Sequence, residues 1–96
     1  MIQEVIVRTN AHEDFKPLVV AAIRNQMKVL QDSIDTSRRR IAEFEIRTGM
    51  SSDEFERRLR EQEITDSLDY FDWTMELASL RLLERQYQYL SEAEVR

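Results

Sequence analysis

The sequence predicts an all-α protein in which a short helix joins two long antiparallel helices and an extended arm precedes them. The 96-residue chain, one domain in length, has one glycine and one proline, too few for the frequent turns of a sheet protein. Strong helix formers, notably Glu, Arg, Leu and Gln, recur throughout. Apolar residues follow one another at alternating steps of three and four, the spacing of one helix face. A chain of this length is expected to bury roughly 65% of its unfolded surface.

Residues 1–13 are predicted to form the extended arm. The segment from Ile2 to Arg8 is rich in β-branched side chains, which favour an extended backbone. No hairpin turn follows it. A single strand pairs with another chain, pairs with a symmetry copy, or has no regular structure, and the sequence leaves these alternatives open.

The first long helix is predicted over residues 14–48. Asn10 or Asp14 can cap its start, and Pro17 suits its first turn, where a missing N–H costs nothing. Gly49 predicts its end, because helices often stop at a glycine in the left-handed conformation. Its inner face consists of Val20, Ile23, Met27, Leu30, Ile34, Ser37, Ile41 and Phe44.

Opposite charges four residues apart are expected to pair along the exposed face of this helix. The pairs are Asp35–Arg39, Arg39–Glu43 and Glu43–Arg47. The sequence therefore predicts a solvated, salt-bridged outer face.

The short helix is predicted over residues 51–62. Ser51 and Glu54 have the spacing of a capping box, in which each side chain accepts a hydrogen bond from the other residue's N–H. Met50 and Phe55 have the spacing of the hydrophobic staple that accompanies such a box. Phe55 and Leu59 form the apolar side of this helix.

The last helix is predicted over residues 66–93, with Thr65 or Asp66 as its cap. It carries two apolar stripes, which together cover more of the helix than one partner can bury. The first stripe is Leu68, Phe71, Met75, Ala78, Leu82 and Tyr89, with Arg85 in the vacant position. The second is Tyr70, Trp73, Leu77, Leu80 and Tyr87, joined by Leu83 and Leu90.

Apolar residues also widen the face of the first helix in its N-terminal half. In an antiparallel hairpin, this half lies against the C-terminal half of the last helix, so the excess apolar surface falls at one end. A second copy of the chain there would complete a dimeric four-helix bundle. The candidate interface residues are Val19, Val29, Leu83, Tyr87, Tyr89 and Leu90.

Charge and composition restrict the partners and the compartment. Residues 1–47 carry a formal charge of +1 and residues 48–96 carry −6. The acidic half favours a basic protein partner and disfavours nucleic acid, because Arg38–Arg40 and Arg57–Arg60 are interleaved with acids. A helical nucleic-acid regulator remains an alternative. With no cysteine, signal peptide or membrane-length apolar run, we expect a cytoplasmic protein that does not enter a membrane.

No residues have the spacing of a catalytic group, so we expect a non-enzymatic protein without cofactors. His12 is the only histidine, and no partner for a metal site or general base accompanies it. Asp69, Asp72 and Glu76 recur on one side of the last helix and could hold a hard cation. A metal-dependent helical hydrolase is therefore a second alternative.

The run Phe44-Glu45-Ile46-Arg47-Thr48-Gly49-Met50-Ser51-Ser52-Asp53-Glu54-Phe55, followed by Asp69-Tyr70-Phe71-Asp72-Trp73, resembles a family of small prokaryotic proteins. They carry an F-E-x-x-Y-G-M-[ST]-x-E-E-F centre and a D-x-x-D-[YF]-F-[DE]-W box, and their genes resemble the antitoxin half of a toxin–antitoxin pair. The likeness covers roughly residues 40–77 and departs at Thr48, where the family tends to have Tyr. It implies an antitoxin-like binder of a toxin and brings no catalytic residues.

Overall fold

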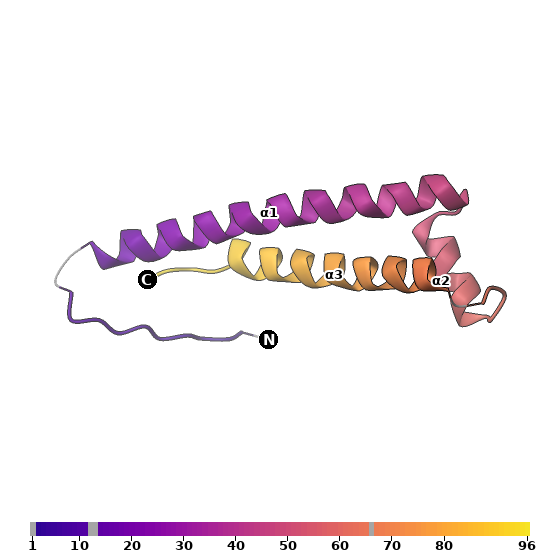
Figure 1. Cartoon of the computed structure of the whole chain (residues 1–96). Helices are drawn as coiled ribbons and strands as arrows, with labels where there is room; N and C mark the ends of the chain where they lie inside the picture. Colours follow the sequence, from indigo (N-terminus) through magenta and orange to yellow (C-terminus); the bar gives the residue numbers. More distant parts are fainter. Residues whose placement is uncertain (1, 12–13, 66) are drawn as a thin grey trace.

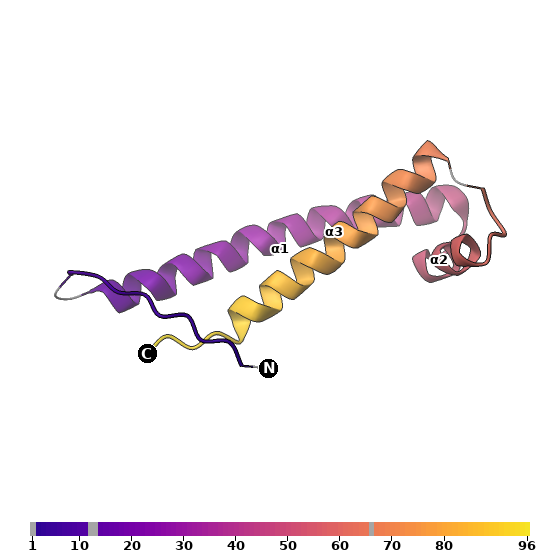
Figure 2. The same cartoon turned by 90° about the horizontal axis from the view of Figure 1, so that it is seen from below.

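The computed structural model describes residues 2–11, 14–65 and 67–96, which form three helices and no strand. Helix α1 spans Phe15–Thr48, α2 spans Ser52–Arg60 and α3 spans Leu68–Ser91. Figures 1 and 2 show α1 and α3 running antiparallel, with α2 beside the end where the chain turns back. We call this the closed end, and we call the other end, near the start of α1, the open end. The predicted all-α class and helix order are confirmed.

The hairpin is elongated. It measures 61 × 26 × 19 Å, with a radius of gyration of 18.9 Å, against about 13 Å for a compact domain of this length. It exposes 8047 Å², whereas a compact monomer of 11.5 kDa exposes about 5,800 Å². The chain therefore buries only about half of its unfolded surface, less than expected from its length, because two helices cannot enclose a core.

The inner face of α1 is confirmed. Leu30, Ile34, Ser37 and Ile41 are buried against α3, and the remaining members of the predicted face are half-buried. At the C-terminus, Gly49 has φ 71° and its N–H donates to the Glu45 carbonyl at 2.9 Å. The sequence thus predicted both the buried face and its end.

The start of α1 differs from the prediction. Asp14 precedes the first helical residue in a left-handed conformation with φ 62°, and no side chain caps the helix. Asp14 thus occupies the N-cap position, as one of the two predictions placed it, but the expected capping hydrogen bond from its side chain is not formed. Asn10 lies outside the start of the helix. Pro17 lies in the first turn, as expected.

The predicted ion pairs along α1 are also not formed. Arg39 donates to the Thr36 hydroxyl at 3.1 Å, and Asp35 accepts from the Gln31 amide at 2.9 Å. The Arg47 guanidinium lies 4.8 Å from the centre of the Phe44 ring. Other neighbours on α1 therefore contact these side chains. Arg38 and Arg40, which were not in the predicted pairs, reach across the hairpin to Glu84 at 3.4 Å and to Glu76 at 3.7 Å.

An aromatic stack joins the three helices at the closed end. Phe55 of α2 and Trp73 of α3 are fully buried and lie parallel, with ring centroids 3.9 Å apart. Phe44 of α1 stacks on Trp73 at 5.6 Å. The Trp73 Nε1–H donates to the Ser52 hydroxyl at 3.2 Å, so the buried indole keeps a polar partner. Ile41 and Leu77 complete the buried cluster.

Half of the predicted capping box is present on α2. The Ser51 hydroxyl accepts from the Glu54 N–H at 3.1 Å. The Glu54 carboxylate does not return to Ser51, because it accepts hydrogen bonds from Arg57 at 2.8 Å and Arg58 at 2.9 Å. The helix ends at Arg60, two residues early, and the chain then turns through a left-handed residue, Gln62, with φ 57°.

Helix α3 begins two residues later than predicted. Its cap is Ser67, whose hydroxyl accepts from the Tyr70 N–H at 3.2 Å. Thr65 is therefore not the cap, and Asp66 lies outside the described residues. The helix ends at Ser91 with no basic residue in its last turn. Within the described residues, no helix is long and apolar enough to cross a membrane.

Replacing Phe55 with alanine tests the aromatic stack. The variant opens a cavity beside Trp73, and we expect a loss of about 3–5 kcal/mol in the free energy of unfolding. Urea denaturation followed by circular dichroism measures this change. The control is Ile46→Ala, which removes an exposed side chain and should shift stability by about 0.5 kcal/mol at most. Equal effects from both variants would contradict the structure.

A second prediction concerns acid stability. Hydrogen bonds from Arg57 and then Arg58 lower the pKa of Glu54 from 4.5 to about 2. A carboxyl with a lowered folded-state pKa stabilises the fold above its unfolded value and loses that contribution as the pH falls through its folded value. We therefore expect stability to decline between pH 4.5 and about 2, and Glu54→Gln to flatten the decline in urea titrations across that range. An unchanged slope would contradict the assignment.

Candidate interaction surface

Helix α3 presents one apolar stripe to α1 and leaves the other uncovered. Trp73 and Leu77 are buried, and Tyr70 and Leu80 are half-buried beside them. The opposite stripe is exposed, with fractions from 48% at Leu82 to 78% at Leu68. We call it the outer stripe. Its members are Leu68, Phe71, Met75, Ala78, Leu82 and Tyr89.

The structure divides the six candidate interface residues between different surfaces. Leu83, Tyr87 and Leu90 are half-buried on the side of α3 that continues the inner stripe, and Val19 is half-buried on α1. Val29 is 49% exposed, since it lies about 100° around α1 from buried Leu30. Tyr89 is 65% exposed and belongs to the outer stripe.

Four strongly exposed residues were not among the predicted interface candidates: Leu68, Phe71, Met75 and Leu82. The signal was present, because the two stripes on this helix cannot both face α1. The spacing of apolar residues did not show how α3 is rotated about its own axis, and therefore which stripe faces α1. The stacking of Trp73 on Phe55 sets that rotation.

Other large apolar side chains are exposed away from α3. Leu18 near the open end is 65% exposed. The described N-terminal residues, 2–11, have no regular structure and are exposed throughout. They follow an extended path in Figure 1. Their apolar members are Ile2, Val5, Ile6 and Val7.

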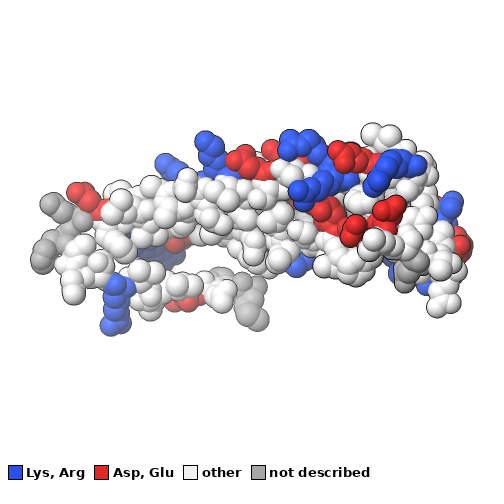
Figure 3. Space-filling model, viewed as in Figure 1, with Lys and Arg blue, Asp and Glu red and all other residues white. Residues whose placement is uncertain are grey.

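Charged side chains are unevenly distributed along the hairpin. On the face drawn in Figure 3 they gather towards the closed end, and the surface nearer the open end is largely uncharged. Two of the three α2 arginines pair with neighbouring acids: Arg57 binds Glu54 at 2.8 Å and Glu63 at 3.3 Å, and Arg58 binds Glu54 at 2.9 Å. The hydrogen bond from Arg57 lowers the pKa of Glu63. These arginines therefore do not form a free basic patch.

A polar link interrupts the apolar seam between α1 and α3. The Ser37 hydroxyl, buried on α1, donates to Glu76 Oε1 at 2.7 Å. The other carboxylate oxygen lies 3.7 Å from Arg40. The serine in the predicted apolar face therefore lies opposite a glutamate on α3, and each side chain provides the hydrogen-bond partner that the other needs.

The three acidic residues proposed as cation ligands have separate surroundings. Glu76 contacts Ser37 and Arg40, whereas Asp69 and Asp72 line two different surface hollows. Among the described residues, no three His, Cys, Asp or Glu side chains are grouped so that they could hold a metal ion. His12 lies outside the described residues.

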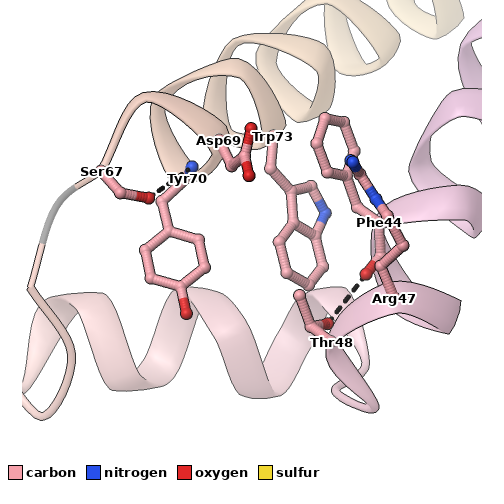
Figure 4. A pocket seen from close by; sticks show the side chains of 7 residues that line it. All are labelled: Phe44, Arg47, Thr48, Ser67, Asp69, Tyr70 and Trp73. Carbon is pink, nitrogen blue, oxygen red and sulfur yellow. Dashed lines mark hydrogen bonds between the residues drawn. The ribbon is translucent and has the colours of Figure 1, made fainter.

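A shallow hollow of about 350 Å³ lies at the closed end (Figure 4). Its lining residues are Phe44, Arg47, Thr48, Ser67, Asp69, Tyr70 and Trp73. Several of its polar groups already have partners within the fold. The Thr48 hydroxyl donates to the Phe44 carbonyl at 2.8 Å, and the Arg47 guanidinium lies 4.8 Å from the centre of the Phe44 ring. The hollow is a surface depression between α1 and α3 that has no nucleophile paired with a base.

A double-mutant cycle tests the polar link. Ser37→Ala leaves a partly buried carboxylate oxygen without its donor, and we expect a cost of about 1 kcal/mol. In a Glu76→Ala background, the same change should cost less than half as much, because the partner has gone. Urea denaturation measures each corner, with exposed Ser33→Ala as the control. Equal costs in both backgrounds would show that the two side chains are not coupled.

We compared the chain with protein-family models, curated proteins and solved structures, and found no match. The resemblance to the small prokaryotic family therefore depends only on the motif at residues 44–55 and 69–73. In the structure these residues build the closed end: Phe44, Phe55 and Trp73 stack, Gly49 ends α1 and Ser51 caps α2. The motif specifies this junction of the fold.

Proposed function

We propose that this chain is a non-enzymatic protein-interaction module that acts as a homodimer and binds a basic protein partner, in the manner of an antitoxin. The outer stripe of α3 is the observation that carries this proposal. Five of its side chains are large, apolar and about half exposed or more. Contiguous apolar surface of this kind marks interaction sites in soluble proteins.

The surface area supports association. The chain exposes 8047 Å², about 2,200 Å² more than a compact monomer of its mass. A typical stable interface removes about 800 Å² from each partner. The excess is therefore large enough for a self-contact and for a second contact elsewhere on the hairpin.

The charge distribution supports a basic partner. Residues 48–96 carry −6, so they attract a positively charged protein and speed its encounter. The resemblance to antitoxin-like proteins suggests that this partner is a toxin. The acidic charge acts at long range on the encounter. We assign the contact itself to the apolar surface of the open end and to residues 2–8, whose extended, exposed chain could add a strand to the edge of a partner's sheet.

Co-expression with the product of the adjacent gene in the native genome tests this function. We expect that product to be small and basic, to arrest growth when expressed alone, and to co-purify with this chain when growth is restored. Leu18→Glu, at an exposed apolar position near the open end, should weaken the complex at least about tenfold, a change of roughly 1.4 kcal/mol. The matched control is Ile46→Glu, at an exposed position near the closed end. If the product of the adjacent gene neither arrests growth nor binds this chain, the antitoxin role is refuted.

A further inference from the structure

The outer stripe of α3 is nearly symmetric about a point between Ala78 and Ser79. Leu68 precedes this point by as many residues as Tyr89 follows it, and Met75 and Leu82 are likewise equidistant. We infer that two copies of the chain pair their α3 helices antiparallel through the outer stripe, about a two-fold axis at this point. This inference rests on the homodimer proposed above and names its interface.

A two-fold axis across the stripe makes the surface self-complementary. It places Leu68 level with Tyr89 of the second copy, and Met75 level with the second copy's Leu82. Large apolar side chains then face one another at these two levels, and Phe71 lies level with Gln86 of the second copy. The small residues Ala78 and Ser79 meet at the centre, where they let the two helix backbones approach closely, since the distance between helices depends on the side chains at the contact.

Charge selects the antiparallel arrangement. Asp72 borders the stripe, and Arg85 occupies the position where its apolar spacing is interrupted. Both are exposed, and neither forms an ion pair with another described residue. They are equidistant from the same central point, so antiparallel pairing sets Asp72 of each copy level with Arg85 of the other. A parallel pair would instead set Asp72 beside Asp72 and Arg85 beside Arg85, and such like-charge contacts oppose association.

The area of the stripe fits this role. From Leu68 to Tyr89 the stripe is about 31 Å long at 1.5 Å per residue. Its five large side chains, each about half exposed or more, would bury on the order of 500 Å² per chain. This is more than half of the roughly 800 Å² that each partner contributes to a stable complex.

A charge exchange tests the pairing. Asp72→Arg creates two Arg–Arg contacts in the homodimer, and Arg85→Asp creates two Asp–Asp contacts, so each variant should raise the dimer dissociation constant at least about tenfold. An equal mixture of the two variants should form a heterodimer close to the wild type in strength, and the D72R/R85D double variant should recover its homodimer. Sedimentation velocity over a concentration series measures all four samples, and circular dichroism verifies their folding.

Asp32→Arg, an exposed charge reversal on α1, is the matched control and should leave dissociation unchanged. A wild-type chain that stays monomeric would refute the homodimer of the proposed function, and this inference with it. A wild-type dimer that responds equally to all charge variants would leave the homodimer standing and overturn the α3 pairing.

Cysteine cross-linking supplies an independent readout, because the natural chain has no cysteine. A mixture of Leu68→Cys and Tyr89→Cys chains should oxidise mainly to the mixed dimer, since antiparallel pairing brings these two positions level. If each variant cross-links with itself as fast as with the other, the antiparallel arrangement is wrong.

Discussion

The stacking of Trp73 between Phe44 and Phe55 is the interaction on which the rest of this structure depends. One indole contacts an aromatic ring from each of the other two helices, and its N–H donates to Ser52 at the start of α2. Burial of these rings provides much of the core of a hairpin that has little other enclosed volume. Because Trp73 and Leu77 must face inwards, the rotation of α3 about its axis is set, and the outer stripe must face solvent.

The same constraint explains why the fold is elongated and strongly exposed. Away from the closed end, α1 and α3 diverge in Figure 2, and the residues of their facing surfaces are only half-buried towards the open end. The seam between them includes the hydrogen bond from Ser37 to Glu76, which satisfies polar groups without adding apolar burial. Two helices of this length reach a closed arrangement when a second pair of helices covers them.

Local sequence signals predicted the helices well. They did not predict the side-chain partners and cap positions that depend on tertiary packing. Gly49 and Ser51 act within a few residues of their own position, so their pattern sufficed. The Glu54 carboxylate, the arginines of α1 and the cap at Ser67 each had several partners or positions of similar energy, and the packed structure decides between them. For the interaction surface, the sequence identified both stripes of α3 but not which one faces α1. It placed the candidates at the open end and did not include Leu68, Phe71, Met75 and Leu82, which the structure leaves exposed on the outer stripe.

The central claim is that the closed end is stable within one chain and that the outer stripe binds a second copy. Hydrogen exchange at two protein concentrations tests this claim most directly. Above the dissociation constant, we predict slow exchange along all of α3. Below it, amides near Phe55 and Trp73 should stay protected, whereas those from Leu82 to Leu90 should exchange much faster, because fewer buried contacts hold that part of the helix. Protection that does not depend on concentration, or that is lost first around Trp73, would contradict this account.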